Sequence, residues 1–284
     1  MVSAFPSLVS AQWLADHRHE PDVVVIDASR HLPAAGRDPH AEFAAGHIPG
    51  ARFLDLASLT DASSHVPAAL PNTAQLTERL ASLGVEPGSR IVLYDDSYVK
   101  TSARAWFALW SHGVDQVAIL DGGLARWRSE GRALETGEPE PGHAAPITLT
   151  SATGIRTKTQ MLANLETCAA QVLDARGADR VYGAGIDPVH GGQNGRIPGS
   201  LNLPFGQVFN PDGTFKPVAE LRAVFAAAGV DLNRPIVTTC GSGVTASVLL
   251  FALHLAGAHD TALYDGSWQE WEADPATPKA QGPA

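Results

Sequence analysis

Short apolar runs rich in β-branched residues alternate along this chain with segments whose apolar residues recur at helical spacing. The runs predict strands at 23–26, 91–94, 117–120, 172–173 and 236–239. The helical patterns lie at 72–83, 101–111, 218–228 and 245–256. Strands that are apolar almost throughout and alternate with helices indicate an α/β fold, in which a parallel sheet carries helices on both faces.

The two halves of the chain resemble each other at a nearly constant offset. GHIPGA at 46–51 corresponds to GRIPGS at 195–200, and residues 101–127 align without gaps with residues 245–271. Two unrelated α/β domains could share an element order, but element order does not require the paired DGG..RW and DGS..EW motifs. We therefore predict a duplicated domain, with an N-terminal copy at 1–132, a linker at 133–155 and a C-terminal copy at 156–284. The tail from Asp274 has no apolar period and is expected to fray.

Charge and hydropathy exclude several classes of partner. The formal net charge is −10, and the Lys and Arg residues form no run that could follow a phosphate backbone, which argues against nucleic acid. The longest apolar run, 246–258, is interrupted by His254 and is shorter than the ~18 residues that a membrane span needs. Residues 1–17 lack the pattern of a signal peptide, so we expect a cytoplasmic protein without a membrane partner.

One of the two cysteines lies where α/β proteins place their reactive groups. Cys240 follows the strand at 236–239, and GSGVT separates it from a helix expected to start near Thr245. Glycines allow backbone N–H groups to turn inward, and a helix N-terminus favours an anion. The pattern predicts a reactive thiolate, whereas Cys168 in NLETCAAQVL has no such loop and is expected to be a packing residue. A Cys-dependent phosphatase would need an arginine at the position of Ala246.

These motifs together give the chain a family resemblance. CGSGVTA, the HIPG and RIPG pair, the DG..W segments and the DAR...R element resemble tandem rhodanese-type sulfurtransferases, and the loop is most similar to that of the 3-mercaptopyruvate sulfurtransferases. The resemblance covers about residues 7–272. It implies two rhodanese-like domains, of which only the C-terminal one is catalytic. The aligned N-terminal loop has Asp95 opposite Cys240, and a carboxylate does not carry sulfane sulfur.

The resemblance also implies roles for individual residues. Cys240 would carry the persulfide, Ser242 would hydrogen-bond the sulfur and assist proton transfer, and Arg180 would hold the carboxylate of a 2-oxo acid. The remaining candidates are the backbone groups of the loop and two less certain side chains: Gly241, Gly243, Val244, Thr245, Arg196 and His65.

The sequence departs from the family pattern at three positions. Val189 stands where many relatives have a second substrate arginine, and Arg196 is the residue that could compensate. Ala57 and Ala68 align with the family's Asp and His, with His65 displaced by three residues. Arg176 of the DAR element is expected to be structural and paired with a nearby carboxylate.

The resulting prediction is an enzyme that moves sulfur from 3-mercaptopyruvate through Cys240 to a thiol, such as thioredoxin, or to cyanide. Thiosulfate is the alternative donor, although GSGVT lacks the basic residues that would suit its double charge. A non-catalytic rhodanese scaffold is an alternative of another class. No metal or organic cofactor is expected, because the histidines lack ligand spacing and no phosphate-binding glycine motif occurs.

Overall fold

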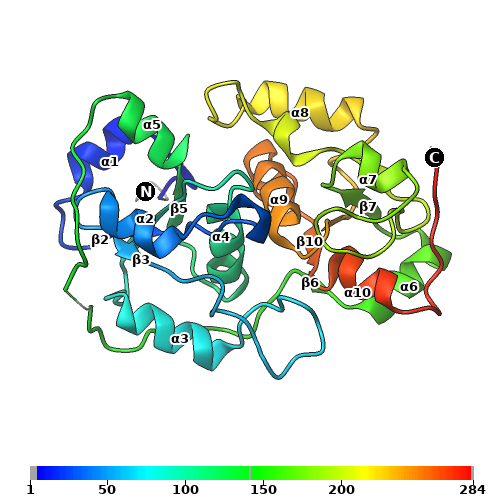
Figure 1. Ribbon diagram of the computed structural model, residues 1–284, viewed down its shortest axis with the longest axis horizontal. Helices are drawn as coiled ribbons and strands as arrows, with labels where there is room; N and C mark the ends of the chain where they lie inside the picture. The colour runs from blue at the N-terminus through cyan, green and yellow to red at the C-terminus, as the bar shows by residue number, and fades with distance from the viewer. Residues whose placement is uncertain (1–4, 141, 283–284) are drawn as a thin grey trace. The chain divides into compact units, whose positions relative to one another are not determined.

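The computed structural model describes residues 5–140 and 142–282, and its strands form two separate sheets (Figure 1). The strands of the first sheet are β1 (Leu8–Val9), β2 (Val23–Asp27), β3 (Arg52–Phe53), β4 (Arg90–Tyr94) and β5 (Val117–Leu120). Those of the second are β6 (Ile155–Arg156), β7 (Gln171–Asp174), β8 (Leu201–Asn202), β9 (Ile236–Thr239) and β10 (Thr261–Tyr264).

Both sheets are parallel and repeat one topology. The first has the order β1-β5-β4-β2-β3 and the second the order β6-β10-β9-β7-β8, so each strand has its counterpart in the other half. The registers agree as well: β2 pairs with β4 from Val23–Arg90 to Asp27–Tyr94, and β7 pairs with β9 from Gln171–Ile236 to Asp174–Thr239. The predicted α/β fold with two tandem copies is confirmed.

Helices connect the strands in the same alternating order. In the first half they are α1 (Ala11–His17), α2 (Pro39–Ala45), α3 (Thr73–Ser82), α4 (Ser102–Ser111) and α5 (Gly123–Ser129), with a 3₁₀ turn at Pro33–Ala35. In the second they are α6 (Lys158–Thr167), α7 (Ala178–Tyr182), α8 (Val218–Ala227), α9 (Val244–Ala256) and α10 (Ser267–Ala273), with a 3₁₀ turn at Phe205–Val208.

Each sheet is covered on both faces. On one face of the C-terminal sheet, Met161 of α6 and Trp268 and Trp271 of α10 pack with Val237 of β9 and its neighbours. On the opposite face α9 lies against β9 and β10, with α8 beside it. The apolar residues from Ala246 to Leu253, Leu249 and Leu250 among them, are buried, which is why the apolar residues of this helix are not confined to one side.

The described chain divides into two compact units that exchange short segments. The N-terminal unit comprises residues up to Asp61, Leu70–Thr153 and Pro211–Phe215; the C-terminal unit comprises Ala62–Ala69, Gly154–Asn210 and Lys216 onward. Segment 62–69, which contains His65, therefore belongs with the C-terminal unit, although it precedes the linker in sequence.

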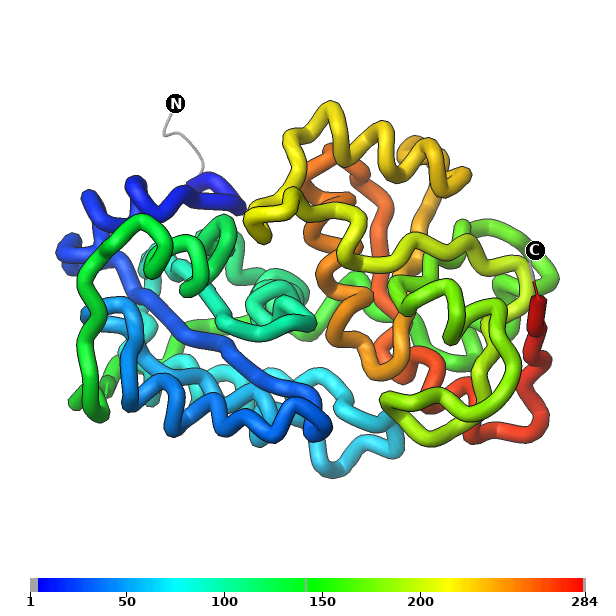
Figure 2. Tube along the Cα trace, turned by 45° about the horizontal axis from the view of Figure 1, so that its top comes forward, coloured from blue at the N-terminus to red at the C-terminus, as the bar shows by residue number. Residues whose placement is uncertain are grey.

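Residues 274–282 of the C-terminal tail are held by hydrogen bonds, so the expectation that the tail frays from Asp274 is wrong for these residues. Trp271 donates its indole N–H to the carbonyl of Pro278 at 2.8 Å, and the hydroxyl of Thr277 bonds the carbonyl of Asp274 at 2.9 Å. Ala280 pairs with Arg196 through two backbone hydrogen bonds of 2.9 and 3.0 Å. Figure 2 traces this final segment, in red, along its own unit. These contacts are polar, which explains why an apolar pattern does not reveal them.

Candidate active site

Cys240 lies at the carboxyl end of the central strand of the C-terminal sheet. It follows β9 directly, and α9 begins at Val244, one residue before the predicted start. Gly243 is the N-cap of α9 and has φ 82°, a left-handed conformation that glycine adopts without a side-chain penalty. Three residues therefore separate the thiol from the first turn of a 13-residue helix.

The sulfur of Cys240 is buried and faces a backbone donor. Cys240 is 2% exposed, and the N–H of Gly243 donates to its Sγ at 3.1 Å. This N–H belongs to the helix N-terminus, where unpaired amide groups favour negative charge. The loop therefore directs an oriented dipole at the sulfur and itself contains no positively charged side chain.

Ser267 holds the backbone of Cys240 and was not predicted from the sequence. Its Oγ accepts from the N–H of Cys240 at 3.2 Å and donates to the carbonyl of Tyr264 at 2.9 Å. The N–H of Trp268 then donates to the carbonyl of Cys240 at 2.9 Å. Ser267 adopts φ 50°, which is uncommon for a residue other than glycine, and the bonds of its hydroxyl hold it there.

The N-terminal half has an equivalent loop with a carboxylate in place of the thiol. Asp95 follows β4, and its carboxylate accepts from the N–H groups of Ser97 and Ser102, both at 2.9 Å. The N–H of Leu124 donates to the carbonyl of Asp95, as that of Trp268 does to Cys240. The duplicated loop therefore binds the side chain at this position through backbone N–H groups.

Arg180 is fixed by a buried carboxylate. Its Nε and Nη2 donate to Asp187 at 3.1 and 2.7 Å, and the side chain of Asp187 is fully buried while that of Arg180 is 17% exposed. Burial opposes ionisation of Asp187, but hydrogen bonds from Arg180 and from the N–H of Val189 outweigh it and lower the pKa of that carboxyl. Asp187 therefore engages the edge of the guanidinium that is formed by Nε and Nη2.

Arg176 is structural, as predicted. Its guanidinium forms an ion pair of 2.7 Å with Asp174 and lies over the ring of Trp268, 4.7 Å from the centroid. It is also 3.7 Å from Asp187, so it links the end of β7 to the loop that holds Arg180.

Arg196 contacts the C-terminal tail. Its Nη1 donates to the carbonyl of Gly282, and its guanidinium lies 5.1 Å from the ring centroid of Tyr182. The contacts known for this side chain within the described residues therefore do not include the Cys240 loop.

The remaining predicted residues lie in and near the loop. Gly241 and Gly243 are buried, whereas Ser242, Val244 and Thr245 are half-buried. In the described part of the chain, no hydrogen bond joins the hydroxyl of Ser242 to Cys240. His65 is exposed.

His190 is a second residue that the sequence did not single out. A β-carbon built on Gly241 would lie 1.9 Å from Nε2 of His190 and 2.2 Å from its Cδ2, so the imidazole rests directly on the residue after Cys240. Burial and the positive charge of Arg180 lower the pKa of His190 below its ordinary value of 6.5. A neutral imidazole therefore flanks the cysteine loop at neutral pH.

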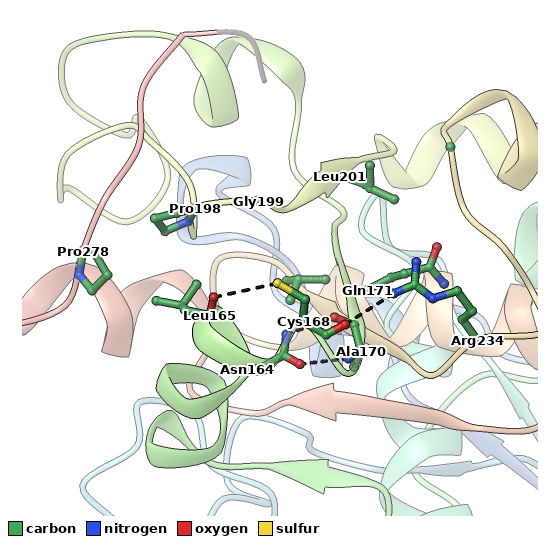
Figure 3. Close-up of a pocket in the computed structure, with 12 residues that line it drawn as sticks. Asn164, Leu165, Cys168, Ala170, Gln171, Pro198, Gly199, Leu201, Arg234 and Pro278 are labelled. Carbon is green, nitrogen blue, oxygen red and sulfur yellow. Dashed lines mark hydrogen bonds between the residues drawn. The ribbon is translucent and has the colours of Figure 1, made fainter.

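Cys168 lies outside this site, and the expectation that it packs in the core is wrong. It is exposed, caps the C-terminus of α6 with φ 49°, and lines a hollow of 510 Å³ (Figure 3). Its Sγ is 3.8 Å from the carbonyl of Leu165, and Nη2 of Arg234 donates to the carbonyl of Cys168 at 3.3 Å. The residue serves as the turn at a helix end, a role that needs no burial.

Among residues 5–140 and 142–282, no group of three His, Cys, Asp or Glu side chains is arranged to hold a metal ion. No helix in the same ranges is long and apolar enough to cross a membrane.

Comparisons with known proteins agree with the internal duplication. The model of the rhodanese-like domain matches twice, at residues 10–130 and 157–274. The chain is 37% identical to the 3-mercaptopyruvate sulfurtransferase of Mus musculus over 94% of its own length and 92% of the relative's. It is also 37% identical to the enzyme of that name from Escherichia coli K12, with 93% and 94% covered.

The chain is also similar to a thiosulfate sulfurtransferase and to a protein of known structure. The thiosulfate sulfurtransferase of Cricetulus griseus is 34% identical over 98% of this chain and 96% of its own. The crystal structure of SseA from Escherichia coli, described among 3-mercaptopyruvate sulfotransferases, superposes with a TM-score of 0.83 at 35% identity, covering 92% of this chain and 98% of that one.

Proposed function

This chain belongs to the rhodanese family as a tandem-domain sulfurtransferase, and from that premise we propose that it transfers sulfane sulfur from 3-mercaptopyruvate through a persulfide on Cys240. The observation that carries the proposal is the hydrogen bond of 3.1 Å from the N–H of Gly243 to Sγ of Cys240 at the start of α9. The relatives named 3-mercaptopyruvate sulfurtransferase support the choice of donor.

The first half-reaction transfers one sulfur atom to the enzyme. The thiolate of Cys240 attacks the sulfur of 3-mercaptopyruvate, the C–S bond breaks, and its electron pair leaves on the enolate of pyruvate. Protonation of the enolate at carbon gives pyruvate. Arg180 orients the donor by presenting its Nη1 and Nη2 edge to the carboxylate, while Asp187 holds the guanidinium from the other side.

The second half-reaction releases the sulfur. In the proposed mechanism the loop from Gly241 to Thr245 stabilises the persulfide anion through backbone N–H groups, and we assign to Ser242 the hydrogen bond to the outer sulfur. A thiol acceptor such as thioredoxin, or cyanide, attacks that sulfur and returns Cys240 as a thiolate. Neither half-reaction requires a metal or an organic cofactor.

The proposal divides the chain into a catalytic and a non-catalytic half. Residues 156–284 form the catalytic domain and 133–155 the linker, while 1–132 form a domain without catalysis because Asp95 takes the position of the thiol. His65 and Arg196 stay as lower-ranked candidates, and the contact of Arg196 with Gly282 favours a structural role for it. We place the enzyme in the cytoplasm, where reducing conditions keep Cys240 free.

Thiosulfate is the second candidate donor, because a relative named thiosulfate sulfurtransferase is 34% identical to this chain. The same persulfide would form, with sulfite as the leaving group. The uncharged Gly241 and Ser242 in the cysteine loop favour the singly charged donor instead.

Intact mass spectrometry after brief incubation with each donor tests the proposal. We expect the wild-type protein to gain one sulfur atom that a reductant removes, to gain it faster from 3-mercaptopyruvate, and Cys240→Ser to gain none. Faster loading from thiosulfate would overturn the donor assignment. A folded wild-type protein that gains sulfur from neither donor would favour a non-catalytic scaffold.

A further inference from the structure

His190 lies at the catalytic loop, on a segment that is held rigidly. The N–H groups of Val189 and His190 donate to the carboxylate of Asp187 at 2.8 and 3.3 Å, and the same carboxylate binds Arg180. Farther along, the indole N–H of Trp268 donates to the carbonyl of Gln193 at 2.8 Å. One buried carboxylate therefore holds both the proposed donor-binding guanidinium and the backbone of His190.

The imidazole is directed at the loop that carries the sulfur. Its Nε2 contacts the backbone of Gly241, which is bonded to Cys240. Within the described residues no hydrogen bond engages the ring, and the side chain is half-buried. A neutral ring in this position has one nitrogen able to accept a proton.

The charged groups that face His190 keep it neutral. Burial lowers its pKa most, Arg180 and Arg176 lower it further, and Asp187 opposes them in part. Because the pKa of the ring lies below 6.5, the imidazole is a base at pH 7 and becomes an acid once it has taken a proton.

The proposed first half-reaction requires such a group. An ordinary thiol has a pKa of about 8.5, so 3-mercaptopyruvate arrives mainly with its sulfur protonated, and the product methyl group contains one hydrogen more than the donor carbon. We propose that His190 moves this proton: its imidazole takes the S–H proton of 3-mercaptopyruvate and returns it to C3 of the pyruvate enolate. The inference rests on the proposed function and assigns a further catalytic residue to the same site.

The atoms and charges of this step balance. Cys240 thiolate, the donor thiol and neutral His190 become Cys240 persulfide anion, pyruvate and neutral His190, with one S–S bond formed and one C–S bond broken. Loading from thiosulfate moves no proton, since the thiolate takes a sulfur atom and sulfite leaves. Discharge of the persulfide to cyanide, which forms thiocyanate, moves none either.

Only loading from 3-mercaptopyruvate moves a proton, so a comparison of the three reactions tests the proposal. His190→Asn keeps a polar side chain of similar size but cannot accept and return a proton. We expect quenched-flow mass measurements to show loading from 3-mercaptopyruvate slowed about 100-fold, in the range found for general acid–base catalysts. Thiosulfate loading and cyanide discharge should stay within about twofold of wild type. His259→Asn, which changes an exposed histidine of the same unit, is the matched control and should leave all three rates unchanged.

Two additional measurements separate proton transfer from a structural role. In the wild type, the ratio of 3-mercaptopyruvate loading to thiosulfate loading should fall as the pH drops below about 6.5, and His190→Asn should lack this decline. Free imidazole should restore part of the 3-mercaptopyruvate rate to His190→Gly.

Each contrary result has a distinct meaning. If His190→Asn slows the three reactions equally, or slows none of them, the role of His190 is overturned while the proposed function stands. If the wild-type protein itself takes no sulfur from 3-mercaptopyruvate, the proposed donor is overturned, and the role assigned to His190 with it.

Discussion

The contact between His190 and Gly241 can be tested without any substrate, through the stability of Gly241→Ala. The new methyl group would lie 1.9 Å from Nε2, against about 3.4 Å for an ordinary contact, so the ring or the loop has to move by about 1.5 Å. Overpacking of this kind costs about 1–3 kcal/mol. We expect the free energy of unfolding of the C-terminal unit to fall by that amount.

A double-mutant cycle assigns the cost to the histidine. With His190→Ala the methyl group has space, so the double variant should be more stable than the sum of the single changes by about 1–3 kcal/mol. Amide hydrogen exchange of β9 in increasing urea reports the unfolding free energy of this unit. Gly206→Ala is the matched control, because a β-carbon at Gly206 meets no atom within 4 Å and should cost little.

Additivity of the two changes within about 0.5 kcal/mol would refute the reasoning, because it would mean that the ring does not rest on Gly241 in solution. The same result would remove the geometric basis for assigning proton transfer to His190.

Two other predictions concern charged groups, Asp27 in the first half of the chain and Arg180 in the second. Burial raises the pKa of Asp27 to about 6 from 3.8, so the native state binds a proton between about pH 4 and 6 that the unfolded state has lost, and stability falls as the pH rises through this window. Asp27→Asn should remove a loss of about 2 kcal/mol, measured as the difference in unfolding free energy between pH 4 and 7; a pH dependence equal to that of wild type would contradict the assignment. Arg180→Lys keeps a positive charge beside Asp187 but loses the planar edge that would bind the carboxylate of the donor. Steady-state kinetics should therefore show KM for 3-mercaptopyruvate rising about tenfold, with a smaller change in kcat. An unchanged KM would exclude Arg180 from donor binding.

The fold could be predicted from the sequence because the hydrophobic period and the internal repeat extend over whole strands and helices. The strand at 236–239 and the helix near 245–256 lie almost where the pattern places them. β10 has only one β-branched residue, Thr261, so its composition does not mark it as a strand; its pairing with β9 determines it.

The site could be predicted from the sequence only in part. Cys240 and its glycines form a local motif, and the motif predicts the helix N-terminus beside the sulfur. Ser267 lies 27 residues after Cys240, and His190 lies in a separate loop before it. No spacing rule links such positions to the cysteine loop. Their contacts depend on Asp187 and Tyr264, which the pattern treats as ordinary loop and strand residues.

The two halves of the chain use equivalent loops differently, because Asp95 stands where the other half has Cys240. The carboxylate of Asp95 accepts hydrogen bonds from backbone N–H groups of its own loop, and DSYVK there includes a tyrosine that is 82% exposed. The matching segment of the other half has to admit a donor and an acceptor to its sulfur in turn, so Gly241 and Gly243 must stay small. The first loop thus has its backbone donors engaged by a side chain of its own, whereas under the proposed function the second keeps its donors for the sulfur that passes through it.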